Sequence, residues 1–192
     1  MLIIGLNGLA HSGKDTLARE YSLKAKCYNV AFADPLRAMI SVLGVKIEDM
    51  LDTEKKNDPQ YGFLGKSPRY LLQTLGTEWG RTLVNDNIWI EVAKRRIDDS
   101  EKLGYEIVFV TDCRFDNEAE AIKSWGGRIV RIIRPNSEAY QKSVESGGVK
   151  NHASEAGLKL ENIDFTIYND STIKAMVDTL DEYISFKSKY SN

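Results

Sequence analysis

The stretch GLAHSGKDT, residues 8–16, has the spacing of a phosphate-binding loop: Gly8, four intervening residues, then Gly13 and Lys14. It follows an apolar run and opens a helical pattern, which is the context that this motif requires. Glycines let backbone N–H groups turn toward phosphate oxygens, and the Lys14 ammonium can reach the outer phosphates. The stretch therefore predicts a site for a nucleoside triphosphate.

Asp15 departs from the usual loop, in which a Ser or Thr follows the lysine and holds magnesium. A carboxylate at this position can serve Mg²⁺ directly or through water, with the Thr16 hydroxyl beside it, or Asp15 can simply cap the helix. Asp112 ends the apolar run EIVFVTD, where P-loop proteins carry a second metal-supporting carboxylate; a helix cap explains it nearly as well. Asp15 and Asp112 are therefore the metal candidates.

Three arginines, Arg114, Arg131 and Arg134, lie at or near the carboxyl ends of predicted strands, where ligands of an open α/β sheet gather. Arginines suit the negative charge that spreads over a migrating phosphoryl group. Side chains alternate along a strand, so Arg131 points to the opposite face from Arg128 and Arg134. We therefore expect one or two of these arginines to reach the phosphates.

Two stretches predict a site for a second anionic substrate. AFADPLRAM places Asp34 and Arg37 at a helix start, facing the phosphate-binding loop across a cleft, where Arg37 either holds an acceptor phosphate or is an ordinary surface residue. In SPRYLLQTLGTEWGR, Arg69, Gln73 and Thr77 recur at i, i+4 and i+8. Such side chains can hydrogen-bond to a nucleobase edge.

The same stretch offers three further residues, Arg81, Trp79 and Trp89. Arg81 continues the helix face of Arg69. Either tryptophan can stack on a base, but tryptophans belong to the core more often than to a ligand site.

Alternating apolar runs and amphipathic stretches predict an α/β fold of the P-loop NTPase type, with three layers and a parallel sheet of about five strands. The expected strands are residues 2–6, 28–33, 106–112, 127–134 and 164–170. Helical spacing marks residues 13–25, 34–44, 67–83, 87–104, 115–127 and 171–189. The stretch 47–66 reads as an exposed excursion, and residues 135–155 as a small mobile lid.

Bulk composition excludes several classes of protein. The 192 residues carry 26 Lys plus Arg against 28 Asp plus Glu, a net charge of −2, which argues against a nucleic-acid partner. The apolar N-terminal run has no basic leader before it and continues into the glycine loop, which argues against a signal peptide or membrane span and favours a cytoplasmic protein. Cys27 and Cys113 lie in apolar runs without metal-binding spacing, as expected for buried free thiols.

Several of these stretches, taken in order, resemble the deoxynucleoside monophosphate kinases of tailed bacteriophages, a branch of the nucleoside monophosphate kinase superfamily. They are GLAHSGKDT, FADPLR, LLQTLGTEWGR with DNIW, VTDCRFDNEA, HASE and DFTIYND. The resemblance implies transfer of the ATP γ-phosphate to a deoxynucleoside 5′-monophosphate, with ATP and Mg²⁺ as cofactors. It also accounts for Asp15, because GKD is this group's own form of the loop.

The resemblance implies a role for each matching position. The ATP phosphates would be bound by Gly8, His11, Ser12, Gly13, Lys14, Asp15 and Thr16. The acceptor would be bound by Asp34, Arg37, Arg69, Gln73, Thr77, Glu78 and Arg114. Lys14, Arg131 and Arg134 would stabilise the transferring phosphoryl group. His152 with Glu155 would latch the lid, or His152 is a surface residue that begins a short helix.

We expect one P-loop kinase domain over residues 1–192, with a core of residues 1–33, 104–134 and 156–192, an acceptor-binding helical region of residues 34–103, and the lid. Its partners would be small-molecule substrates, and a homodimer is left open. Three alternatives remain. The first is a kinase for another small acceptor, such as phosphomevalonate or a nucleoside. The others are a nucleotide-gated ATPase or switch module, and a nucleic-acid-processing ATPase, which the net charge disfavours.

Overall fold

The structure, a computed structural model, describes residues 1–138, 141 and 158–190. The chain divides into two compact units. Met1–Val30 and Asp99–Asn192 form one, called here the sheet unit, and Ala31–Asp98 form the other, the helical unit. In the described part of the chain, no helix combines the length and the apolar character of a membrane span.

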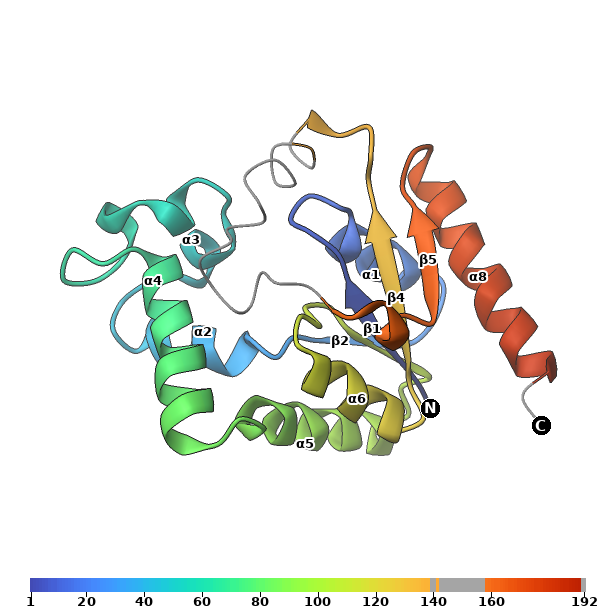
Figure 1. Cartoon of the computed structure of the whole chain (residues 1–192), viewed down its shortest axis with the longest axis horizontal. Helices are drawn as coiled ribbons and strands as arrows, with labels where there is room; N and C mark the ends of the chain where they lie inside the picture. The colour runs from blue at the N-terminus through green and yellow to red at the C-terminus, as the bar shows by residue number, and fades with distance from the viewer. Residues whose placement is uncertain (139–140, 142–157, 191–192) are drawn as a thin grey trace. The chain divides into compact units, whose positions relative to one another are not determined.

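The sheet unit is built on five parallel strands in the order β2-β3-β1-β4-β5 (Figure 1). They are β1 (Leu2–Asn7), β2 (Cys27–Val30), β3 (Ile107–Val110), β4 (Arg128–Ile133) and β5 (Phe165–Tyr168). β1 lies between β3 and β4, with Ile4 opposite Phe109 and Leu6 opposite Val130. The predicted parallel sheet of five strands is confirmed, and each strand lies within a residue or so of the predicted ranges or inside them.

Helices cover both faces of this sheet. Ile4 and Leu6 of β1 belong to a core that also contains residues of α1 (Lys14–Tyr21) and α8 (Ile173–Tyr190). The opposite face packs on α6 (Asp116–Ser124): a Cβ atom added at Gly5 would lie 2.8 Å from the Ile122 Cδ1 atom of that helix. Alternation along β1 thus produces the three predicted layers, and β1 is buried on both faces.

The helical unit contains α2 (Asp34–Ser41), α3 (Ile47–Leu51), the short 3₁₀-helices η1 (Lys55–Asn57) and η2 (Pro59–Tyr61), α4 (Pro68–Gln73), the π-helix η3 (Thr74–Val84) and α5 (Ile88–Lys102) up to Asp98. Ile40, Val45 and Met50 form its small core, against which leucines of α4 and η3 pack. The prediction that residues 47–66 are exposed is wrong at Asp49 and Met50, which are buried. Met50 supplies the apolar contact, and Asp49 is paired with Lys55.

The single helix predicted over residues 67–83 consists of two kinds of helix. Ser67 caps its start by accepting a hydrogen bond from the Tyr70 N–H at 3.3 Å, and α4 then continues into η3. Gly76 and Gly80 of η3 adjoin the buried indole of Trp89, whose Nε1 donates to the Gly76 carbonyl at 2.8 Å. A Cβ atom at Gly80 would lie 2.4 Å from that ring, so the small residue permits close contact.

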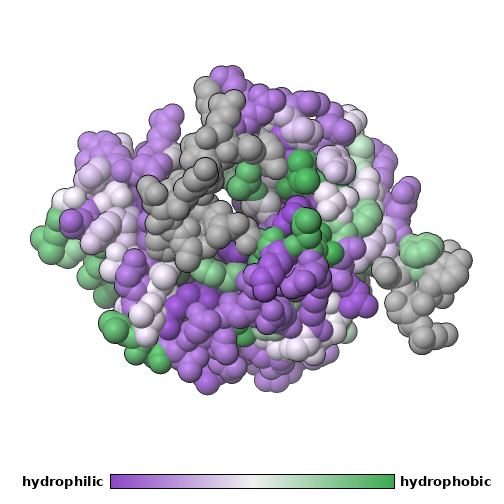
Figure 2. Space-filling model, viewed as in Figure 1, coloured by the Kyte–Doolittle hydropathy of each residue, from purple (hydrophilic) through white to green (hydrophobic). Residues whose placement is uncertain are grey.

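Figure 2 shows that hydrophilic side chains predominate on the visible face, with apolar side chains in small separate groups. The surface agrees with the charged fraction of 28% in the sequence.

We predict that Gly80→Ala lowers the free energy of unfolding by about 1–3 kcal/mol, because its methyl group would overlap the rigid Trp89 ring. Gly76→Ala is the matched control. Its methyl group would meet only the flexible end of Leu36 at 3.0 Å, and alanine favours a helix by about 1 kcal/mol over glycine. Urea unfolding of both variants checks the prediction; equal stabilities would contradict it.

Candidate active site

The loop after β1 has the backbone of a phosphate cradle. Gly8 and Gly13 have φ angles of 147° and 106°, and His11 has 63°. A Cβ atom at Gly8 would lie 2.4 Å from the Ile132 carbonyl oxygen, and one at Gly13 would lie 2.5 Å from the Asn169 Nδ2 atom. Both glycines are therefore required by conformation and by space, as the motif predicts.

The side chain of Lys14 turns back into this loop. Its ammonium donates to the carbonyl oxygens of Gly8 at 2.7 Å and Leu9 at 2.8 Å, and contacts the Ser12 hydroxyl at 3.4 Å. Helix α1 begins here without a side-chain cap, with Gly13 at the N-cap position. The loop thus combines a fixed positive charge with a helix N-terminus, the two features that favour a polyphosphate.

Asn169, just beyond β5, supports the loop from a distant part of the sequence. Its Nδ2 donates to the carbonyl oxygen of Ser12 at 2.9 Å, and Ser12 is fully buried. Asn169 lies in the predicted strand of residues 164–170, and no role was predicted for it. The available signal was its position at the carboxyl end of a predicted strand.

Arg131 and Arg134 have different surroundings. The Arg131 guanidinium donates from Nε to Asn7 Oδ1 at 3.1 Å and from a terminal nitrogen to the Leu158 carbonyl at 3.0 Å. Asn7 in turn donates to the Cys113 carbonyl at 2.9 Å. Arg134 follows β4 and is exposed. Arg131 thus links β4 to the end of β1 and to Leu158, and a catalytic role for either arginine stays a prediction.

The two metal candidates are Asp15, which follows the glycine loop, and Asp112, which follows β3. Asp15 is exposed in the first turn of α1, where Gly13 is the N-cap, so Asp15 does not cap that helix. Asp112 is half-buried, and at α6 the capping carboxylate is that of Glu118, which accepts hydrogen bonds from the backbone N–H groups of Arg114 and Phe115. The helix-cap alternative is therefore not supported for Asp15, and the role of Asp112 stays a prediction.

Among the described residues, no three His, Cys, Asp or Glu side chains cluster closely enough to hold a metal. Mg²⁺ commonly uses one or two carboxylates together with substrate phosphates and water. The oxygens of Asp15, Thr16 and Asp112 are of the kind that Mg²⁺ prefers, and a magnesium site at these residues stays a prediction.

Two titratable groups behind β3 have shifted pKa values. The backbone N–H of Lys159 donates to Asp116 at 3.0 Å, and this bond lowers the pKa of the carboxyl, with a smaller contribution from the Asn162 amide. Burial raises the pKa of the Cys113 thiol well above its usual value. Asp116 therefore anchors residues 159–162 to the start of α6, and the free thiol of Cys113 is poorly nucleophilic.

In the helical unit, Asp34 pairs with two arginines. Its Oδ1 accepts from Arg37 at 2.9 Å, and its Oδ2 accepts from Arg96 of α5 at 2.8 Å and from the Ala31 N–H at 3.0 Å. Asp34 and Arg37 were predicted to belong to the acceptor site, and the structure brings them together. Arg96 was missed, because it lies in an ordinary amphipathic helix outside any motif.

The predicted row on α4 and η3 is changed by the π-helix. An α-helix has about 3.6 residues per turn, so i+4 passes one full turn. A π turn holds more than four residues, so i+4 falls short of it. The two deviations have opposite sign, which keeps Thr77 close to the line of Arg69. Arg69, Gln73 and Thr77 are all half-buried, whereas Glu78 is exposed.

Arg81 and Trp89 do not lie at the surface where a ligand could reach them, whereas Trp79 does. Arg81 is buried and donates to the backbone and side-chain oxygens of Asp86, so it holds the turn between η3 and α5. Trp89 is a core residue. Trp79 is 40% exposed, with its ring centroid 6.2 Å from that of Trp89, and it is the tryptophan that a ligand could contact.

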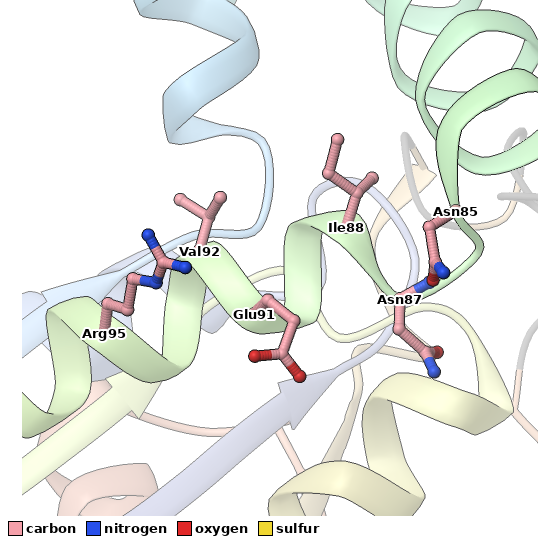
Figure 3. Close-up of a pocket in the computed structure, with 6 residues that line it drawn as sticks. All are labelled: Asn85, Asn87, Ile88, Glu91, Val92 and Arg95. Carbon is pink, nitrogen blue, oxygen red and sulfur yellow. The ribbon is translucent and has the colours of Figure 1, made fainter.

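An open pocket of about 450 Å³ lies at the start of α5 (Figure 3). It is lined by Asn85, Asn87, Ile88, Glu91, Val92 and Arg95. In Figure 3, Ile88 and Val92 project from one side of α5 and Glu91 from another. None of the predicted site residues lines this pocket.

Three further residues, Arg114, His152 and Glu155, were predicted to contact the acceptor or the lid. Arg114 is exposed just after β3. His152 and Glu155, predicted to latch a lid over residues 135–155, lie outside the described residues. Their roles stay predictions.

We predict that Asn169→Ala weakens ATP binding about three- to tenfold, the effect of one neutral hydrogen bond, because the Ser12 carbonyl loses its donor. Direct titration with a non-hydrolysable ATP analogue measures the effect. Asp170→Asn, a change at the exposed neighbouring residue, is the control and should bind as the unaltered protein does. Equal affinity of the Asn169 variant would show that this contact does not support the loop.

Known proteins similar to this chain are kinases, as the geometry of the glycine loop suggests. A family model described as deoxynucleotide monophosphate kinase matches residues 45–180. A protein of Acanthamoeba polyphaga mimivirus, whose name assigns it to the same family, is 30% identical over 186 residues, with 91% of each chain covered.

Two phage proteins match over shorter stretches. The deoxynucleotide monophosphate kinase of Enterobacteria phage T4 is 29% identical over 57% of this chain and 42% of its own length. The deoxynucleoside-5′-monophosphate kinase of Escherichia phage T5 is 30% identical over 62% of this chain and 45% of its own length. The chain therefore matches less than half the length of these two relatives.

Solved structures support the fold alone. Shikimate kinase from Aquifex aeolicus superposes with a TM-score of 0.51 at 15% identity, covering 98% of this chain and 99% of its own. A sugar kinase from Janibacter gives 0.51 at 10% identity, covering 96% and 95%. The fold is that of the P-loop kinases, and the family predicted from the motifs is confirmed. This chain belongs to the deoxynucleotide monophosphate kinase family.

Proposed function

We propose that this protein transfers the γ-phosphate of ATP to the phosphate of a deoxynucleoside 5′-monophosphate, giving ADP and the deoxynucleoside diphosphate. The observation that carries the proposal is the Lys14 ammonium held inside the glycine loop, in a chain of this family. Its substrates are two small molecules.

The sheet unit binds the donor. Backbone N–H groups between Gly8 and Thr16 and the N-terminus of α1 surround the ATP phosphates, and Lys14 supplies the positive charge. The ammonium now donates to two backbone carbonyls, and phosphate oxygens compete for its protons when ATP is bound. Mg²⁺, held by Asp15 and Asp112 with the phosphates, would neutralise part of their charge.

The helical unit binds the acceptor. Arg37 holds the phosphate of the monophosphate, and the half-buried row of Arg69, Gln73 and Thr77 contacts its nucleoside part. The amide of Gln73 can both donate to and accept from a base edge, and the exposed ring of Trp79 offers a stacking surface.

The reaction needs no dedicated general base. An oxygen of the acceptor phosphate is already anionic and attacks the γ-phosphorus in line, while the bond to the ADP oxygen breaks. The protein's contribution is to position both substrates and to stabilise the charge on the transferring group, for which Lys14, Arg131 and Arg134 are the candidates. Exclusion of water then decides between transfer and hydrolysis.

Turnover of ATP with a panel of deoxy- and ribonucleoside monophosphates tests the proposal. We expect ADP release only with an acceptor present, and a matching nucleoside diphosphate as product. Lys14→Ala should lower kcat by about 10²-fold or more, because it removes the fixed charge at the phosphates. Lys174→Ala, which changes an exposed lysine of α8, is the control. Acceptor-independent ADP release, or an unimpaired Lys14 variant, would contradict the proposal.

Arg69→Ala should raise the KM for the monophosphate about tenfold with a much smaller change in the KM for ATP, since one charge-assisted contact to the acceptor is lost. Steady-state kinetics in both substrates measure the two constants. Lys46→Ala, at an exposed cation of the same unit, should leave both unchanged. If the KM for ATP rises instead, Arg69 does not belong to the acceptor site.

A further inference from the structure

The carboxylate of Asp34 holds two guanidinium groups from two helices of the helical unit. Each oxygen takes one: Oδ1 accepts from Arg37 at 2.9 Å, and Oδ2 accepts from Arg96 at 2.8 Å. The Ala31 N–H also donates to Oδ2 at 3.0 Å, which fixes the carboxylate against the backbone. Arg37 and Arg96 are thus oriented by one rigid acceptor.

The charges of this cluster do not balance. Two guanidinium groups meet one carboxylate, which leaves an excess of one positive charge among side chains only 19–37% exposed. Arginines keep their charge at all physiological pH values, so the excess cannot be removed by deprotonation. A partly desolvated positive excess attracts an anion more strongly than a surface charge does.

The cluster also holds a donor with no acceptor. Among the described residues, the buried Nε atom of Arg37 makes no hydrogen bond. Buried N–H groups are almost always paired, and leaving one unpaired destabilises the folded protein. Asp34 uses one terminal nitrogen of each arginine, so further N–H groups of both remain to bind an anion with several oxygens.

We propose that Arg37 and Arg96 together bind the phosphate of the acceptor monophosphate, and that Asp34 is the positioning residue that orients both. The inference rests on the proposed function and adds Arg96, a second phosphate-binding arginine, to it. A phosphate monoester carries two negative charges and three terminal oxygens, so it can accept from both guanidinium groups while Asp34 stays in place.

The competing explanation is a structural one, in which Asp34 and Arg96 only join α2 to α5. The two explanations differ in what they predict for Asp34→Asn. That change removes a negative charge, so simple electrostatics would tighten anion binding. If Asp34 positions the arginines, the neutral amide cannot hold both, and anion binding weakens although the positive excess has grown.

The experiment compares two probes that differ only in the phosphate. Titration with dAMP, dGMP, dCMP and dTMP identifies the monophosphate that binds most tightly, and its nucleoside is the second probe. Arg96→Ala should weaken the monophosphate about 10- to 100-fold, as expected for charge-assisted hydrogen bonds, and change nucleoside binding less than about twofold. Arg96→Lys should recover part of the loss, because it keeps the charge and loses the fork.

Arg95→Ala is the matched control, since it removes the same charge from the adjacent, exposed position of α5 and should bind both probes normally. Asp34→Asn should weaken the monophosphate several-fold. Thermal melting of each variant separates binding from folding, and a poorly folded Ala variant leaves the Lys variant to decide. Unchanged monophosphate affinity in folded Arg96 variants, or tighter binding by Asp34→Asn, would overturn the proposal.

Kinetics keep this outcome separate from the proposed function. If the unaltered protein phosphorylates a monophosphate and the Arg96 variants keep its KM, the function stands and the inference fails. A raised KM with nearly unchanged kcat and KM for ATP supports the inference. If the unaltered protein transfers phosphate to no monophosphate, the proposed function itself has failed.

Discussion

The contact on which the nucleotide loop depends is the one between the Lys14 ammonium and the carbonyl oxygens of Gly8 and Leu9. The chain leaves a strand buried on both faces and enters a helix within six residues, through backbone angles that favour glycine. The carbonyl and N–H groups of that turn lie outside the hydrogen-bond pattern of the sheet. The Lys14 ammonium donates to two of these carbonyls, and the proposed function assigns the N–H groups to the phosphates.

In the helical unit, side chains and not backbone groups supply the fixed polar contacts. Asp34 orients two arginines, and the pair Gly76 and Trp89 joins η3 to α5. Both arrangements combine a fixed polar contact with close packing. Under the proposed function, the donor site is built on backbone and would tolerate few side chains, while the acceptor site is built on side chains and would change its preference with few substitutions.

Much of this architecture could be predicted from local pattern. Continuous apolar runs indicated the five strands, and the glycines with their lysine predicted the conformation of the loop, because both signals lie within a few neighbouring residues. The pairing of Arg96 with Asp34, 62 residues apart, and of Asn169 with Ser12, 157 apart, could not be predicted, since no local rule says which distant polar groups meet. The burial of Met50 in a polar stretch, and the change to a π-helix at Thr74, likewise depend on tertiary packing.

The support of Ser12 by Asn169 has a consequence for biosynthesis. Strand β1 emerges first, yet its neighbours in the sheet are β3 and β4, and the amide that holds the loop comes after β5. A nascent chain therefore carries the glycine loop on the ribosome for most of translation without the contacts that shape it. The sheet around the loop and the contact from Asn169 to Ser12 are therefore complete only after residue 169 has left the exit tunnel.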